Sequence, residues 1–333
     1  VLGNVIPSYA AQDDLADSST PPFRVAFSER LFTEVNPADA KAAVKVWAEM
    51  IAKEYNINLD PQLQITNSTN QIIQVFENHL VHSVALTLAE YFEVSRRVQV
   101  DDFLVGTVNG DIYCEYLLLV HRDSGIKNLP DLKGRSLSLF DNPSMCLSVP
   151  WLDVFLSQNG LGTTTAAFFG KMTRNVKLSP AVLRVFFRQD DACLVTRNGY
   201  NTLLELNPQL GNHLQILASS SRFITTLFCF LSDSMNSSYD SLANSMLKLD
   251  ESPTGKQILM MFKTEKLVRI KASDLEPALE LLAQPKKSRR KTKTVLATLG
   301  AHPETGGPIE LCDGRYGPFV SDGKINVSVP KDM

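Results

Sequence analysis

Residues 63–88 read LQITNSTNQIIQVFENHLVHSVALTL, and the spacing of the hydrophobic residues changes twice along this stretch. Residues 63–65 and 84–88 fit short strands, whereas 70–79 fit a helix that the pair Asn67-Ser68 would cap. A strand, a helix and a strand in this order are typical of a βαβ unit, in which the two strands run parallel.

The segment before this unit repeats the alternation. Residues 23–27 alternate as a strand does, and Pro37 then opens a helix with Asn36 as its N-cap. Apolar residues recur at three-four spacing over 40–51, as in an amphipathic helix. The first part of the chain therefore predicts a parallel sheet flanked by helices.

A second α/β unit follows the turn at Asn109-Gly110. We expect strands at 112–121, 138–140, 168–169, 191–196 and 214–218, and helices at 149–158, 180–187 and 200–206. Helices are expected again at about 234–249, 252–262 and 272–283. Because the chain would cross between the units near 103–110 and 215–222, the pattern predicts two lobes with paired hinges and a ligand cleft between them.

The formal net charge of −3 hides an asymmetry. Six of the eight residues 286–293 are Lys or Arg, and the rest of the chain carries 27 basic and 36 acidic residues, a net charge of −9. An acidic body gives a nucleic-acid role no electrostatic support. No stretch reaches the roughly 18 uncharged apolar residues that a membrane-spanning helix needs.

Residues 1–21 predict the tail of a signal peptide and a flexible spacer. The first six residues are apolar, and Ser8-Tyr9-Ala10 has the small-x-small form of a secretory cleavage site. A disordered terminus with a chance apolar start is the alternative.

Several phrases in the body carry a family resemblance: IKNLPDLKGR at 126–135, WLDVFL at 151–156, DDACLVTR at 190–197, ELNPQL at 205–210 and ESPTGKQIL at 251–259. Together they resemble the phosphate/phosphite/phosphonate-type periplasmic substrate-binding proteins of ABC transporters, over residues 22–283. The resemblance implies an α/β, two-lobed type II periplasmic-binding-protein fold with paired hinges. Lobe I would comprise 22–106 and 219–283, and lobe II 107–218.

The same resemblance implies a function. The chain would be a non-catalytic solute-binding receptor that binds a small ligand, with an anion as one option, in the interlobe cleft and delivers it to an ABC transporter permease. It would be a periplasmic or exported, membrane-associated monomer without a cofactor.

One turn departs from the family pattern. Phosphonate binders of this kind typically follow a strand of their second lobe with Asp-Pro-x-Ser-Thr-Ser-Gly, whose hydroxyl and amide groups hold the oxyanion. Here residues 141–148 read DNPSMCLS, which keeps Ser144 but places Pro143, Met145 and Cys146 beside it. Weak binding of phosphonates is therefore expected, and a less charged or more apolar ligand is favoured.

The loops expected to face the cleft supply the candidate ligand contacts. These are Ser28, Thr66, Ser68, Thr87, Glu90 and Tyr91 in lobe I, and Asp141, Ser144, Asp191, Arg197 and Tyr200 in lobe II. Each has a competing structural role. Ser68 also fits a helix cap, Asp141 a turn residue and Tyr91 a core aromatic, while Glu90 would suit an amine.

The chain changes character after Ala283. Residues 284–294 predict a basic linker, and 295–333 a small C-terminal β-rich module with Gly/Pro turns. The phrase GRYGPF at 314–319 resembles the C-terminal repeats of bacterial type IA DNA topoisomerases. The resemblance implies weak contact with single-stranded DNA through Arg315, Tyr316, Phe319 and Lys324. Strand cleavage is not expected, because the catalytic tyrosine domain has no counterpart; a natural fusion and a chimera both remain open.

No motif for catalysis or for a metal site is recognised. The sequence contains no G-x-S-x-G, H-E-x-x-H or P-loop lysine motif, and its five cysteines form no C-x-x-C pair and read as buried thiols. His79 and His82 lie three apart without a third ligand, so no metal is expected. Two alternatives to the receptor remain: a DNA-associated protein acting through the tail, and a ligand-sensing module without a transporter.

Overall fold

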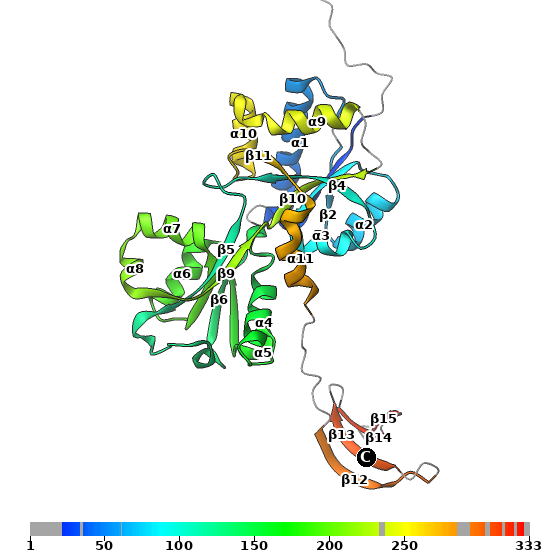
Figure 1. The fold of residues 1–333 in the computed structure, drawn as a ribbon, viewed down its shortest axis with the longest axis vertical. Coiled ribbons are helices and arrows are strands. Elements are labelled where there is room, and N and C mark those ends of the chain that lie inside the picture. Colours follow the sequence, from blue (N-terminus) through cyan, green and yellow to red (C-terminus); the bar gives the residue numbers. More distant parts are fainter. Residues whose placement is uncertain are drawn as a thin grey trace, which may run out of the picture.

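The computed structural model describes residues 22–33, 36–60, 62–232, 237–284, 294–303, 307–314, 317–322 and 325–329. Two α/β lobes lie next to each other, and a small sheet forms the C-terminal part (Figure 1). Lobe I denotes here the six-stranded sheet with its helices, and lobe II the five-stranded sheet with its helices.

The lobe I sheet has the order β11-β4-β10-β3-β1-β2. Its strands are β1 (Val25–Ser28), β2 (Gln64–Thr66), β3 (Ser83–Thr87), β4 (Val100–Gly106), β10 (Thr226–Leu231) and β11 (Leu267–Ile270). β1 runs parallel to β2 and β3, as the βαβ pattern predicts. The sheet as a whole is mixed, because β10 returns from lobe II and inserts antiparallel between β3 and β4.

Helices cover both faces of this sheet. They are α1 (Pro37–Tyr55), α2 (Thr69–Glu77), α3 (Leu88–Val94), α9 (Ser237–Leu247), α10 (Pro253–Met261) and α11 (Glu276–Ala283), with the 3-10 helices η1 (Glu29–Phe32), η6 (Leu249–Glu251) and η7 (Ala272–Leu275). Asn36 caps α1, since its side chain accepts from the amides of Ala38 and Asp39. Trp47 of α1 packs against Phe27 and Phe228, so the amphipathic face of α1 meets the sheet.

The lobe II sheet has the order β7-β6-β8-β5-β9. Its elements are β5 (Cys114–His121), β6 (Ser136–Phe140), β7 (Lys171–Asn175), β8 (Ala192–Thr196), β9 (Leu214–Phe223), η2 (Arg122–Ser124), η3 (Leu129–Leu132), η4 (Pro143–Met145), α4 (Ser148–Gln158), α5 (Thr165–Phe168), α6 (Leu178–Phe186), α7 (Arg197–Leu206) and α8 (Gln209–His213). The expected strand at 168–169 is wrong: those residues end α5, and the next strand begins at Lys171.

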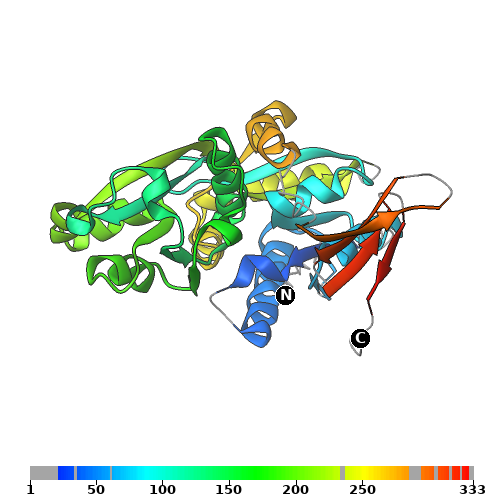
Figure 2. The same cartoon turned by 90° about the horizontal axis from the view of Figure 1, so that it is seen from below.

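Two crossings join the lobes, one between β4 and β5 and one between β9 and β10. The second lies at 224–225 rather than at 215–222, because β9 stays paired with β5 up to Phe223. Residues 219–223 thus belong to the lobe II sheet. In the first crossing the carboxylate of Glu265 accepts from the amides of Asn109 and Gly110, at 3.0 and 2.8 Å. Figure 2 shows the lobes side by side from below.

The C-terminal sheet is an antiparallel meander of β12 (Thr294–Ala301), β13 (Pro308–Gly314), β14 (Gly317–Ser321) and β15 (Asn326–Ser328). Cys312 is fully buried, whereas Leu296, Leu299 and Val327 are exposed. Across the described parts of the chain, every helix is too short or too polar to cross a membrane.

Candidate ligand-binding site

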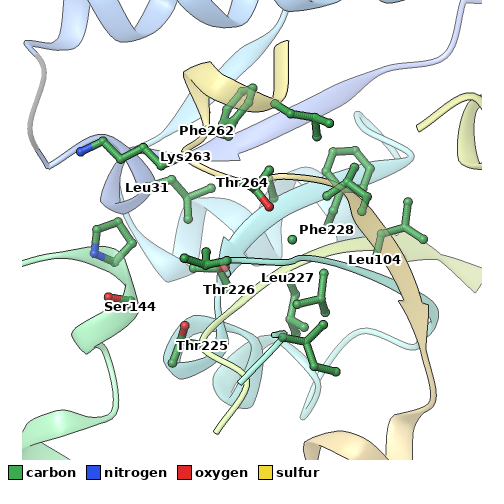
Figure 3. A pocket seen from close by; sticks show the side chains of 18 of the residues that line it. Leu31, Leu104, Ser144, Thr225, Thr226, Leu227, Phe228, Phe262, Lys263 and Thr264 are labelled. Atoms are coloured by element: carbon green, nitrogen blue, oxygen red, sulfur yellow. The ribbon is translucent and has the colours of Figure 1, made fainter. Parts of the chain in front are cut away.

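A cavity of about 430 Å³ extends from the lobe I core to the turn η4 of lobe II. We call it the interlobe pocket. Figure 3 shows Leu31, Thr264 and Phe262 on one side, Thr226 and Leu227 opposite, and Ser144 entering from lobe II. Its volume lies in the range of about 300–1,000 Å³ that is usual for small-molecule sites.

The lobe I wall of the pocket is apolar and aromatic. Phe27 stacks on Phe262 with ring centroids 5.8 Å apart, and Trp47 meets the Phe27 ring edge-on at 5.2 Å. Further apolar side chains complete the wall: Leu31, Phe32, Leu104, Phe228, Met246, Leu249, Ile258, Leu259 and Leu267. The wall forms locally because Ser28 caps η1 by accepting from the Arg30 amide, which turns the chain directly after β1.

The lobe II end of the pocket is polar. The lining residues there are Asn142, Ser144, Thr196 and Asn198. Thr225 of the second crossing and Thr226 at the start of β10 also line the pocket. The Asn142 side-chain oxygen accepts from the Ser144 amide at 3.1 Å and from the Ser144 hydroxyl at 2.9 Å. The phenol of Tyr116 donates to the Ser144 carbonyl at 2.8 Å, which ties the turn to β5.

A buried carboxylate lies at the start of α3. Glu90 is 2% exposed and accepts from the Ser28 hydroxyl (2.7 Å), the Thr87 amide (3.0 Å) and the Thr87 hydroxyl (2.8 Å). Arg30 lies 3.5 Å away. The predicted contacts Ser28, Thr87 and Glu90 are thus brought together, but they bond to one another and do not line the pocket.

Cys146 of lobe II sits against this helix start. Its thiol donates to the Thr225 carbonyl at 3.3 Å. Burial raises the pKa of the Cys146 thiol to about 12, while hydrogen bonds with the backbone of Ala89 and Leu88 act to lower it. The thiol is therefore protonated at neutral pH.

The eleven predicted contacts all lie within the described residues, and Ser144 is the one that lines the pocket. Asp141 and Arg197 are next to lining residues. Asp141 pairs with Arg174 at 3.5 Å. Arg197 makes two hydrogen bonds to Glu115, at 2.6 and 2.7 Å, and these hold the pKa of Glu115 below its usual value.

Asp191 lies at the amino end of β8, away from the pocket. There it accepts from the Ser136 amide and hydroxyl at 2.9 and 2.7 Å, at the start of β6. β6 and β8 are parallel, and Ser144 follows the carboxyl end of β6. Asp191 is thus at the edge of the sheet opposite to the pocket.

Two predicted aromatic contacts are core residues. Tyr91 is 7% exposed and packs edge-on against Phe103 at 5.4 Å, and burial raises its pKa to about 12. Tyr200 is 5% exposed within lobe II. The remaining two have local structural roles: Thr66 ends β2 and donates to the Phe27 carbonyl of β1, and Ser68 caps α2.

The aromatic wall was not predicted as a site. The three-four spacing around Trp47 indicates that this face of the helix is covered, but a helix face that meets a core and one that meets a cavity have the same spacing. Of the predicted tail residues, Phe319 is a half-buried residue of β14, while Arg315, Tyr316 and Lys324 lie outside the described residues.

One group of side chains has the composition of a metal site. Ligand atoms of His121, Asp123 and His213 lie within 4.8 Å of one another. However, the His121 Nδ1 atom accepts from the Asp123 amide, and Arg188 pairs with the Asp123 carboxylate at 2.9 Å. A nearby cation and an occupied ring nitrogen both disfavour a metal ion in this arrangement.

Comparison with known families gives two separate matches. Residues 31–275 match the family described as ABC transporter, phosphonate, periplasmic substrate-binding protein. Residues 302–333 match the topoisomerase C-terminal repeat. The first match spans well over half of the 333 residues.

Solved structures with the same fold cover most of the chain. PhnD1 from Prochlorococcus marinus, solved with methylphosphonate, aligns with a TM-score of 0.57 and 13% identity over 81% of this chain and 100% of its own. A binding-protein component of an ABC phosphonate transporter from Pseudomonas aeruginosa aligns with a TM-score of 0.56 and 17% identity, over 81% of this chain and 90% of its own. At these identities the likeness shows the two-lobed fold.

Curated relatives that match over a short stretch are DNA topoisomerases. DNA topoisomerase 1 of Synechococcus elongatus is 49% identical over 59 residues, which are 18% of this chain and 7% of that enzyme. The chain therefore spans only a small fraction of the topoisomerases that it matches.

Proposed function

The chain belongs to the periplasmic phosphonate-type substrate-binding proteins of ABC transporters, and from this premise we propose that it binds its solute in the interlobe pocket and passes it unaltered to a permease. The family is one of solute-binding receptors, and its members are exported. Attachment to the membrane surface and a monomeric state belong to the proposal.

The main observation that supports this proposal is that residues of both lobes and of both crossings line the same cavity. Ser144 and Asn142 come from lobe II, Phe262 from lobe I, Tyr113 from the first crossing and Thr225 from the second. A ligand held by such a set of residues favours the closed arrangement of the lobes over an open one, because it binds both at once.

The proposal is tested by asking whether the two lobes close on a solute and whether the solute is recovered unaltered. A thermal-shift screen of the full chain against uncharged aromatics, amines, sulfonates and phosphonates would identify stabilising solutes. A stabilising solute should decrease the radius of gyration in solution scattering, and mass spectrometry should recover it unchanged. Recovery of a converted product would contradict the receptor role, and stabilisation without compaction would contradict the interlobe location.

The tail supports a second candidate function. Its match to the topoisomerase repeat, together with the six basic residues in 286–293, favours weak contact with single-stranded nucleic acid. This function would belong to residues 284–333 and not to the acidic body.

A further inference from the structure

We propose that the solute is an uncharged, largely apolar molecule, and that the protein's own Asn142 side chain occupies the donors of η4 to which an oxyanion would bind. This inference rests on the proposed function, since it names the ligand class of the same pocket. Two features of the pocket and one buried cluster outside its lining support it.

The first feature is the use of the donors in the turn η4. An oxyanion at this turn would need the Ser144 amide and hydroxyl as donors. Both already donate to the Asn142 side-chain oxygen, at 3.1 and 2.9 Å. Pro143 has no amide hydrogen to add. Binding an anion here would require Asn142 to leave its two donors first.

The second feature is the charge at the start of α3. The Ser28 hydroxyl and the Thr87 amide and hydroxyl all donate to Glu90, which is 2% exposed. These hydroxyl and amide donors are therefore already used by Glu90, although Glu90 itself does not line the pocket. The Arg30 side chain lies 3.5 Å from the Glu90 carboxylate, so this nearby cation is paired as well. The Cys146 thiol, which donates to the Thr225 carbonyl, also lies at the backbone of Leu88 and Ala89 in this helix start.

The third feature is the pocket lining itself. Among its described lining residues, Asp111 and Lys263 are the charged ones. Asp111 pairs with Arg222. The Lys263 ammonium extends away from the space between Leu31 and Thr226 (Figure 3). Transfer of an anion into such a lining loses hydration without a compensating cation, whereas an aromatic or aliphatic body gains from burial.

The test uses N-phenyl-1-naphthylamine, an uncharged aromatic probe that becomes fluorescent in apolar surroundings. The full chain should bind it saturably, with quenching of Trp47, which lines the pocket. Leu31→Gln places a polar group in the wall and should weaken probe binding about tenfold. Leu63→Gln is the matched control, because Leu63 is also a half-buried leucine packed on the lobe I core but does not line the pocket. It should leave the probe affinity unchanged.

Methylphosphonate and inorganic phosphate should neither bind in calorimetry nor displace the probe. A sub-micromolar dissociation constant for methylphosphonate would overturn the inference while leaving the receptor role intact. Failure of the probe to bind, or equal losses in the two leucine variants, would overturn it as well. If neither neutral nor anionic solutes changed the scattering profile, the proposed function itself would fall.

Discussion

The ion pair between Arg197 and Glu115 lies beside the polar end of the pocket and fixes the start of α7 against β5. Arg197 opens α7 between two pocket residues, Thr196 and Asn198, and its guanidinium makes two short hydrogen bonds to Glu115 of β5. A two-pronged contact of this kind fixes the guanidinium plane as well as its charge. The polar end of the pocket therefore depends on this pair without being lined by it.

Glu115→Gln should lower the free energy of unfolding by about 1 kcal/mol at neutral pH, the usual scale for a half-exposed charged hydrogen bond. The Arg197 hydrogen bond is the main cause of the lowered Glu115 pKa. A lowered pKa stabilises the folded state above the ordinary value of 4.5, and this stabilisation is lost as the pH falls through the lowered pKa. The difference between wild type and variant should therefore vanish in acid.

Urea unfolding at a series of pH values measures this difference. Asp141→Asn is the control, since the Asp141–Arg174 pair is exposed and 3.5 Å apart, and its loss should cost less than about 0.5 kcal/mol. A pH-independent effect of Glu115→Gln would show that the charge on Glu115 is not what stabilises the fold.

The positions of some candidate site residues could be predicted from the sequence and those of others could not, for different physical reasons. Ser144 could be found because a family turn fixes its place. Asp191 opens the strand expected at 191–196, and since parallel strands present their carboxyl ends to the cleft, its position in the sequence already favours the opposite edge of the sheet. The role of Asn142 could not be found, since its hydrogen bonds to Ser144 depend on a side-chain rotamer that the spacing of residues does not encode.

At the scale of elements, η6 and α10 pack closely together and form one part of the pocket wall, which we call the pocket floor. Ser252 caps α10 by accepting from the Gly255 amide at 2.9 Å, and Leu249, Ile258 and Leu259 from the two elements line the pocket. A Cβ atom on Gly255 would lie 1.9 Å from the Leu249 carbonyl oxygen. The helix can approach η6 this closely only because Gly255 has no side chain.

Gly255→Ala should destabilise the protein by about 2 kcal/mol or more, which corresponds to a drop in melting temperature of several degrees. It should also weaken probe binding, because the floor must move. Gly211→Ala is the matched control. Its Cβ would meet only the end of the Leu204 side chain, at 3.3 Å, and a helical Gly→Ala change is otherwise neutral or favourable. Equal melting temperatures of the two variants would refute this account of the floor.

Most helices and strands of both lobes were predicted from hydrophobic spacing, whereas the strands β4, β7, β10 and β11 were not predicted. Residues 214–231 form two strands in different lobes, yet no Gly or Pro separates them, so the crossing at 224–225 has no local signal. The pair Phe168-Phe169 is equally apolar in a strand and at a helix end, and only the packing of α5 decides between them.

At the scale of the whole molecule, the two matches predict two independent activities on one chain. The described tail residues form a single antiparallel sheet that exposes Leu296, Leu299 and Val327. The whole chain without the six basic residues of 286–293 carries a formal charge of −9. A single sheet layer buries little apolar area, so it contributes little to the stability of the lobes.

Removal of the residues after Ala283 should therefore leave the melting transition of the lobes nearly unchanged.

The same truncation should also abolish any binding of single-stranded DNA, because it removes the basic residues of 286–293. Fluorescence anisotropy of the full chain should show weak binding that falls steeply between about 50 and 200 mM salt, since counterions are released from the phosphates on binding. Equal anisotropy for the full and shortened chains would show that the tail does not bind DNA. A large drop in melting temperature on truncation would mean instead that the tail docks on the lobes, and the boundary at 284 would have to move.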